Sequence, residues 1–408
     1  MSFNELIIYH HLSDDCDVLK CLSYFEEKGK LRDQDWISLL LRIAERYDLH
    51  DHLFQSLLTL LLAQHENTFT LLLERKKDVS FQLKKVIMHD LTIIYNYFHY
   101  DFSYLDDLYQ DLFFHFPQSK PIINQEIHEL LCHLQMNLSQ STSVEEFYEI
   151  LYNHYIQYGV GKYGLNKAFR YNDGKIIPID HIGNNTLNQL IGYETQKERL
   201  RANTEAFLSC KKANNVLLYG DSGTGKSSSI KALLNEYYKD GLRMVEVYKH
   251  QFIFLPQIIN ELQNRHYKFI IFMDDLSFED FEVEYKYLKA IIEGGLEKKP
   301  DNILIYATSN RRHLIKETWN DRNHDQEINN NDAKQEKLSL VSRFGVQIMY
   351  IHPNKQHYLD IIDGLAKTYQ IDMDIEQLHT LALQWEIRNG GFSGRTAKQF
   401  IHMLLGKK

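Results

Sequence analysis

Residues 220–227 combine three glycines, a lysine and a serine at the spacing of a phosphate-binding loop. The run matches the pattern G-x-x-x-x-G-K-[ST], and its members, with the serine that follows, are Gly220, Asp221, Ser222, Gly223, Thr224, Gly225, Lys226, Ser227 and Ser228. Glycines let backbone N–H groups turn toward an anion, and the positive end of a following helix adds to the attraction. Lys226 would reach the β- and γ-phosphates as a point charge, while the hydroxyl of Ser227 is a ligand for Mg²⁺. The run therefore predicts a site for a nucleoside triphosphate and its metal ion.

An acidic pair follows an apolar run farther along the chain. Residues 269–273, FIIFM, read as a buried strand, and Asp274 and Asp275 come directly after it. Ligands of open α/β sheets bind at the carboxyl ends of the strands, where these two carboxylates would lie. We expect Asp274 to hold Mg²⁺ through water, together with Ser227, and Asp275 to orient or deprotonate an attacking water. Such a pair alone is typical of a turn or a helix cap, but after a phosphate-binding loop it indicates a nucleotide site.

The elements that must position these side chains are visible as apolar runs. Five of them have the length and composition of strands, at residues 215–219, 243–247, 268–273, 302–307 and 346–351. Stretches of helical periodicity separate them, at residues 226–238, 255–264 and 285–293. This alternation is typical of a parallel sheet with crossover helices on both faces. Helical periodicity returns after Pro353.

Glycine is distributed very unevenly along the chain. Only Gly29 of the 19 glycines precedes residue 159, and the first part shows amphipathic helical periodicity, so we predict an all-α N-terminal domain. Its many aromatic residues recur at spacings of three and four, which is typical of a helical core. The predicted divisions are a helical domain at 1–157, a linker at 158–187, an α/β core at 188–353 and a helical unit at 354–408. Residues 323–337 are almost devoid of apolar side chains and read as a solvated insertion.

Composition excludes several classes of protein. With 46 Lys plus Arg against 55 Asp plus Glu, the formal charge of the 408 residues is −9, which disfavours nucleic acid and anionic membranes as partners. The four cysteines are scattered, which argues against a disulfide framework and fits a reducing, cytoplasmic location. We expect no signal peptide and no membrane-spanning segment, since the longest continuous apolar run is residues 57–63.

From about residue 180 onward the chain resembles the AAA-plus superfamily of ATPases. The resemblance runs through the segments ANNVLLYGDSGTGKSS, FMDDLSFE, KKPDNILIYATSNRRHLI and EKLSLVSRFG. More narrowly, these segments resemble a bacterial ATP-binding family catalogued only as a domain of unknown function. The resemblance implies an α/β fold, namely an AAA-type P-loop domain with a parallel five-stranded sheet and a C-terminal helical lid.

The same resemblance implies roles for residues outside the two motifs. Asn310 matches the polar sensor-1 residue that positions the attacking water, and Arg395 in GGFSGRTAKQF matches the sensor-2 arginine of the lid. Arg343 lies where the family carries an arginine finger, and Arg311 and Arg312 are rival candidates for it. Three further residues match the segment that packs against adenine, namely Leu190, Ile191 and Gly192.

Two departures from the family pattern affect the functional prediction. The usual second carboxylate is Glu, whereas Asp275 is shorter by about 1.5 Å, one carbon–carbon bond, which is compatible with slow turnover. Members that thread polypeptide place an aromatic-apolar-Gly loop after the second strand, but residues 246–259 contain no glycine. Tyr248 or Phe252 would have to substitute, and we favour a protein that does not thread polypeptide.

Three functional hypotheses follow. The first is an ATPase that uses ATP and Mg²⁺ to remodel or load a macromolecular partner, assembled as a homo-oligomer through its ATPase domain, with an unknown protein bound by the N-terminal domain. The second is an ATP-dependent switch that hydrolyses slowly or not at all. The third, a DNA-associated ATPase resembling helicase loaders, is disfavoured by the negative charge. The preference for ATP over GTP rests on the resemblance alone.

Other constellations predict no second chemistry. His128 and Cys132 are one helical turn apart, but with no further ligand nearby in the sequence we expect no metal there. The chain has no G-x-S-x-G motif for a serine hydrolase and no G-x-G-x-x-G spacing at its loop for a nicotinamide cofactor.

Overall fold

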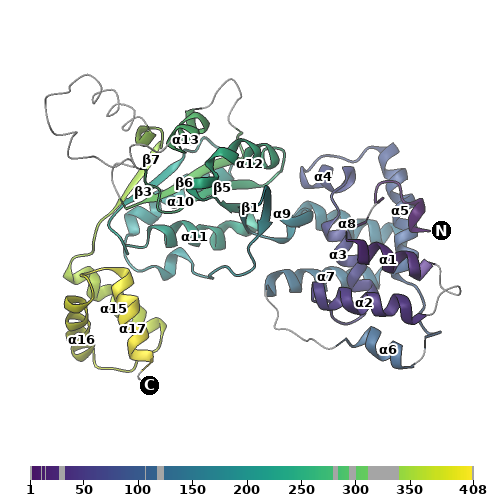
Figure 1. Ribbon diagram of the computed structural model, residues 1–408, viewed down its shortest axis with the longest axis horizontal. Helices are drawn as coiled ribbons and strands as arrows, with labels where there is room; N and C mark the ends of the chain where they lie inside the picture. Colours follow the sequence, from purple (N-terminus) through teal and green to yellow (C-terminus); the bar gives the residue numbers. More distant parts are fainter. Residues whose placement is uncertain are drawn as a thin grey trace. The chain divides into compact units, whose positions relative to one another are not determined.

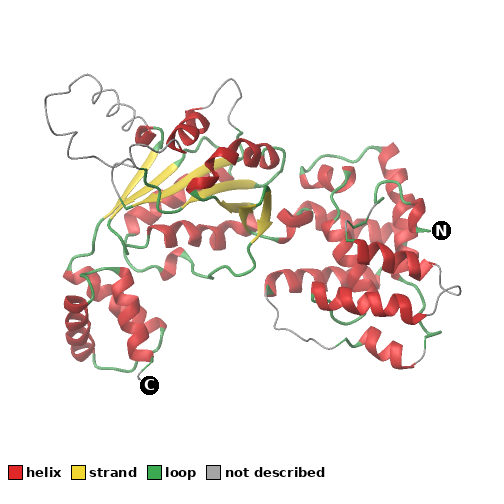
Figure 2. Ribbon diagram, viewed as in Figure 1, coloured by secondary structure: helices red, strands yellow, loops and turns green. Residues whose placement is uncertain are grey.

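The computed structural model describes residues 2–10, 12–13, 15–26, 33–105, 107–116, 124–278, 284–293, 300–310 and 340–406. The chain divides into two compact units, Met1–Asn166 and Lys167–Lys408. In Figure 2 the described part of the first unit is helical, and every strand lies in the second. Arg311, Arg312 and the predicted insertion at 323–337 lie outside the described residues.

The N-terminal unit is built from helices around one that is apolar on all sides. Helix α3 (Leu53–Gln64) contains the apolar run 57–63 and is buried almost throughout, so it forms the centre of this unit. No helix among the described residues is both long and apolar enough to cross a membrane. The other helices of the unit are η1 (Phe3–Glu5), α1 (Cys16–Glu26), α2 (Asp33–Tyr47), α4 (Thr68–Glu74), α5 (Phe81–Phe98), α6 (Asp107–Phe114), α7 (Gln125–Gln140), α8 (Val144–Tyr158) and α9 (Gly161–Leu165).

Aromatic side chains fill the core of this unit. Phe25 contacts the rings of Trp36, Phe54 and Phe102 at centroid distances of 5.2, 4.6 and 5.8 Å. Edge-to-face and tilted pairs of this kind add to the stabilisation that burial provides. The aromatic periodicity therefore reflects core packing, as predicted.

A buried histidine makes the stability of the N-terminal unit depend on pH. His154 in α8 is 7% exposed, and burial lowers its pKa to about 4. As the pH falls below about 6.5 the unfolded chain binds a proton that the folded unit resists, so stability is lost down to about pH 4. We expect a loss of about 3 kcal/mol between pH 7 and pH 4 that His154→Gln does not show. Urea unfolding of both proteins at the two pH values measures it, and equal losses would contradict the prediction.

The second unit contains a seven-stranded sheet with the order β2-β1-β4-β5-β6-β3-β7. All neighbouring strands are parallel except β1 and β2, which pair antiparallel. The strands are β1 (Ala168–Asn172), β2 (Lys175–Pro178), β3 (Val216–Gly220), β4 (Leu242–Glu246), β5 (Lys268–Met273), β6 (Ile303–Ser309) and β7 (Val346–Tyr350).

The strand order determines which loops meet at the carboxyl edge of the sheet. Strand β3 lies between β6 and β7, with Tyr219 opposite Ser309 and Gly220 opposite Tyr350. Strand β5 lies on the other side of β6, where Met273 pairs with Ala307. The residues that follow β3, β5 and β6 therefore emerge side by side.

Helices cover both faces of this sheet (Figure 1). Helices α10 (Glu194–Leu208) and α11 (Lys226–Tyr237) pack their apolar side chains on one face, and α12 (Leu255–Leu262) and α13 (Glu284–Glu293) lie on the other. Short 3-10 turns are η2 (Leu187–Gln189), η3 (Tyr238–Asp240) and η4 (Lys249–Phe254). Three C-terminal helices, α15 (Lys355–Thr368), α16 (Ile375–Arg388) and α17 (Gly394–Leu405), share a core of their own, and we call them the C-terminal bundle.

The sheet corrects the prediction of five strands. The five predicted strands form as expected, to within two residues at each end, but β1 and β2 add to the edge of the sheet beside β4. Both come from the segment predicted as a linker. Their hairpin turns at Asp173 and Gly174, which have φ of +47° and +80°. The sequence contains a signal for this hairpin, because an Asp-Gly pair between two short apolar runs is typical of a hairpin turn.

Candidate functional site

The glycine-rich loop joins β3 to α11 in a conformation that depends on its glycines. Gly220, Gly223 and Gly225 have φ of +126°, +74° and +92°. A Cβ atom on Gly220 would lie 1.9 Å from the carbonyl oxygen of Tyr350, whereas one on Gly225 would meet no atom within 4 Å. The first glycine therefore permits close packing against β7, and the third borders open space at the start of α11, where an anion is favoured.

Lys226 is buried at the start of α11 and is held by three oxygen atoms. Its ammonium donates to the carbonyl oxygens of Gly220 and Asp221 at 3.0 and 2.6 Å and to Oδ1 of Asn310 at 3.0 Å. Burial lowers the pKa of this ammonium, against the opposing effect of the nearby carboxylates of Asp221, Asp275 and Asp274. A desolvated cation with only carbonyl and amide partners is well placed to exchange them for a phosphate.

The acidic pair lies next to this lysine, as the strand order requires. Asp274 accepts hydrogen bonds from the hydroxyls of Ser227 at 2.5 Å and Thr308 at 2.6 Å. Asp275 has a left-handed φ of +51°, and its carboxylate accepts from Nδ2 of Asn310 at 2.8 Å. Asn310 thus bridges Asp275 and Lys226 and joins three loops in one chain of hydrogen bonds.

Thr308 is a site residue that the sequence analysis missed. Its hydroxyl donates to Asp274 and accepts from the backbone N–H of Asp275 at 2.9 Å, so it orients both acidic residues. The side chain is 1% exposed. A signal existed, because Thr308 and Asn310 are two apart at the end of a strand and so share one face.

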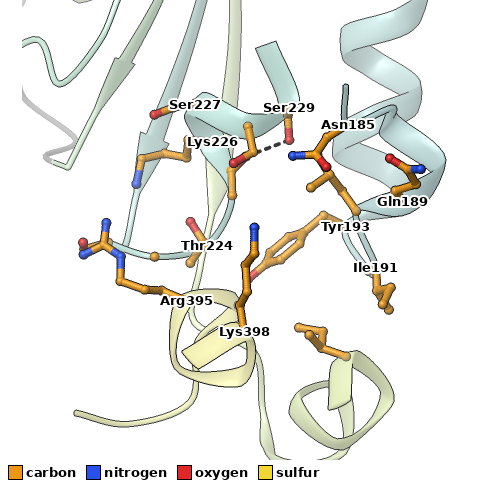
Figure 3. Close-up of a pocket in the computed structure, with 18 of the residues that line it drawn as sticks. Asn185, Gln189, Ile191, Tyr193, Thr224, Lys226, Ser227, Ser229, Arg395 and Lys398 are labelled. Atoms are coloured by element: carbon orange, nitrogen blue, oxygen red, sulfur yellow. Dashed lines mark hydrogen bonds between the residues drawn. The ribbon is translucent and has the colours of Figure 1, made fainter. Parts of the chain in front are cut away.

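The C-terminal bundle contacts the loop through the start of α17. The backbone N–H of Arg395 donates to the carbonyl oxygen of Gly223 at 3.2 Å, and a Cβ on Gly223 would lie 3.1 Å from both Cβ of Arg395 and Oγ of Ser393. Figure 3 shows Arg395 and Lys398 rising from α17 toward the loop. Neither side chain has a hydrogen bond or ion pair with the residues that the structure describes. Lys398 was also missed, although it follows Arg395 by three positions on one helix and so shares its face.

The far end of the cavity is formed by the segment before α10. Lys197 is buried and donates to the carbonyl oxygen of Leu190 at 2.6 Å, which holds the backbone of that segment in place. Ile191 packs so closely on α15 that a Cβ on Gly364 would lie 2.3 Å from its Cδ1. The predicted adenine-binding residues thus lie between the sheet domain and the C-terminal bundle.

These parts enclose a cavity of about 680 Å³. That volume is within the range of pockets for small molecules and cofactors. Predicted residues that line it are Leu190, Ile191, Gly192, Ser222, Gly223, Thr224, Gly225, Lys226, Ser227, Ser228, Asp274, Asp275, Asn310 and Arg395.

Three predicted residues do not line the cavity. Gly220 and Asp221 form the base of the loop and contribute carbonyl oxygens to Lys226. Arg343 lies exposed just before β7, and its backbone N–H donates to the carbonyl oxygen of Leu340 at 3.3 Å. Within one chain, this arginine is not part of the site.

The family of the chain follows from its sequence. Residues 165–408 match the model of a family described as a protein of unknown function, DUF815. The chain belongs to this family. The match confirms the expected resemblance to a family catalogued as a domain of unknown function. No curated protein matches the chain.

Solved structures resemble the chain only distantly. A mutant of RuvB from Thermotoga maritima is 16% identical, with a TM-score of 0.36 over 52% of this chain and 62% of its own. The RuvB Holliday junction branch migration motor of the same organism is 15% identical, with a TM-score of 0.33 over 54% and 72% of the two chains. The chain thus spans less than two thirds of the length of the first of these. Likeness at this level carries no information on substrate or partner.

Proposed function

We propose that this DUF815 member binds and hydrolyses Mg-ATP and uses the cycle to move its C-terminal bundle and remodel or load a macromolecular partner. The observation that supports this best is the chain of hydrogen bonds Lys226–Asn310–Asp275 at the mouth of the glycine loop. In this chain the amide of Asn310 lies between the ammonium of Lys226 and the carboxylate of Asp275. Transfer of a phosphoryl group to water needs that combination of charge neutralisation and water positioning.

Each part of the site has a role in this proposal. The loop amides and the start of α11 bind the phosphates, and Lys226 leaves the carbonyl oxygens of Gly220 and Asp221 to reach them. Ser227 and Asp274 are a hydroxyl and a carboxylate in contact, which are ligands that Mg²⁺ accepts. The ion would neutralise charge on the phosphate oxygens. Asp275 and Asn310 hold the attacking water, and Arg395 reaches the phosphates from the C-terminal bundle.

We place Arg343 in the site of a neighbouring copy of the chain. Its exposure and its absence from the cavity of its own chain support a role in trans. The rate of ATP hydrolysis per subunit should then rise with protein concentration. Arg343→Ala should lower the rate reached at high concentration at least about 100-fold. Phosphate release measured over a concentration series tests both. Arg388→Ala, an exposed arginine at the end of α16, is the matched control.

Specific activity that is independent of concentration, with Arg343→Ala equal to Arg388→Ala, would overturn the role in trans. That result would still be consistent with ATP hydrolysis by a single chain. Phosphate release at the level of a Lys226→Ala blank would overturn hydrolysis itself.

A slow or non-hydrolysing ATP-dependent switch is the second candidate. It is supported by Asp275, whose short carboxylate is already engaged by Asn310 at 2.8 Å. This candidate predicts tight ATP binding with little phosphate release. A helicase-loader-like role predicts DNA binding at about 150 mM salt, which the negative charge of the chain opposes.

Polypeptide threading has little support from the segment after β4. Phe252 is 1% exposed and belongs to the core, so it is not available to grip a substrate. Tyr248 is 45% exposed and its hydroxyl donates to Glu246 at 3.0 Å. We therefore keep the proposal that the partner is remodelled without threading.

A further inference from the structure

Asp221 joins the phosphate-binding loop to the segment that leads into the C-terminal bundle. Its carboxylate accepts a hydrogen bond from the backbone N–H of His352 at 2.7 Å. Its own backbone N–H donates to the carbonyl oxygen of Tyr350 at 2.8 Å. Two bonds therefore tie one loop residue to the end of β7 and to the segment that leads from β7 to α15.

His352 extends this connection to the helix that carries Arg395. Its Nδ1 donates to the carbonyl oxygen of Phe392 at 2.9 Å, since a carbonyl can only accept. Phe392 precedes α17, and its ring lies 5.1 Å from that of Tyr358 in α15. A single imidazole thus connects the segment after β7 with the start of α17.

The other end of the connection is the lysine that must move when a phosphate binds. The carbonyl oxygen of Asp221 accepts from the ammonium of Lys226 at 2.6 Å and from the hydroxyl of Thr224 at 2.8 Å. A triphosphate competes for that ammonium, because its oxygens are charged and the carbonyl is not. Binding therefore removes a charge-assisted bond from the residue that holds His352.

We propose that Asp221 and His352 are positioning residues that transmit nucleotide binding from Lys226 through Phe392 to α17. They thereby set Arg395 and Lys398 over the phosphates. Neither Asp221 nor His352 lines the cavity, so each acts through the groups it holds. The inference rests on the proposed function and adds to it the route by which the bundle responds.

Variants at His352 test this route without touching the cavity. His352→Ala removes the bond to Phe392, and His352→Asn keeps a donor near the position of Nδ1. We expect His352→Ala to change the affinity for Mg-ATP by less than about twofold but to lower kcat about tenfold, the effect of one lost hydrogen bond. His352→Asn should restore most of kcat. His357→Ala, an exposed histidine in the first turn of α15, is the control.

Hydrogen exchange of α17 supplies a readout that local destabilisation would not imitate. Mg-ATP should slow the exchange of residues 394–405 in the wild type and in His352→Asn, and should not do so in His352→Ala or Asp221→Ala. Asp221→Asn keeps an oxygen acceptor for the N–H of His352 and should behave like the wild type in this measurement. If Asp221→Ala does not fold, the comparison of His352→Ala with His352→Asn still tests the inference.

The outcomes separate the inference from the proposed function. Protection of α17 by ATP that persists in His352→Ala, with kcat unchanged, would overturn the inference alone. An Asp221→Asn variant as defective as Asp221→Ala would also overturn it, because charge rather than the hydrogen bond would then matter. A wild-type protein that does not bind Mg-ATP would overturn the proposed function and this inference with it.

Discussion

Lys226→Ala is expected to weaken Mg-ATP binding at least about 100-fold. The buried ammonium has no acidic hydrogen-bond partner among the described residues and is free to exchange two carbonyl oxygens for phosphate oxygens. Charge-assisted hydrogen bonds contribute about 1.5–3 kcal/mol each, and two of them account for a hundredfold or more. Calorimetric titration of the wild type and the variant with Mg-ATP measures the difference.

The matched control is Lys231→Ala in the same helix. That lysine is half exposed, lies 3.8 Å from Glu246 and does not line the cavity, so its loss should leave nucleotide affinity unchanged. Thermal unfolding without nucleotide checks that both variants fold, because Lys226 also holds the base of the loop. Wild-type affinity in folded Lys226→Ala would contradict the assignment of the phosphate site.

Asp275→Asn is expected to retain Mg-ATP binding and to lower turnover about 10²- to 10⁴-fold. The amide has the size of the carboxylate and still accepts from Asn310, so the geometry is kept while the proposed base is lost. Single-turnover phosphate release, measured beside binding, separates the two effects. Asp274→Asn should instead make the binding of ATP depend less on Mg²⁺, because Asp274 contacts Ser227, the other residue proposed to hold the ion.

A longer side chain at the same position provides the complementary test. Asp275→Glu adds about 1.5 Å of reach, and turnover should exceed that of the wild type if the short carboxylate limits the rate. Undiminished turnover in Asp275→Asn would show that another group activates the water. Background release in both Asp275→Glu and the wild type, with intact binding, would favour the switch.

The local parts of the site were determined by the sequence. A glycine-rich loop between a strand and a helix depends on backbone freedom, on the orphan N–H groups of a helix start and on one lysine, and all three are local properties of residues 216–237. The five predicted strands, β3 to β7, were recognisable because parallel strands of this kind are continuous apolar runs. Asp274 and Asp275 follow one of these runs, so their place at the carboxyl edge was predictable as well.

Tertiary structure decided which of these parts meet. The position of β3 between β6 and β7 brings Lys226 to Asn310 and lets Asp221 hold the chain at His352, and pairing between strands is not a local property. The positions of Thr308 beside Asp274 and of Lys398 at the cavity also depend on contacts between distant segments. The sequence predicts a connector where β1 and β2 form a hairpin, because a short two-stranded hairpin is only marginally stable until β1 pairs with β4. Contacts between distant segments depend on packing of the whole sheet, and for that reason the site's connection to the C-terminal bundle emerged only from the fold.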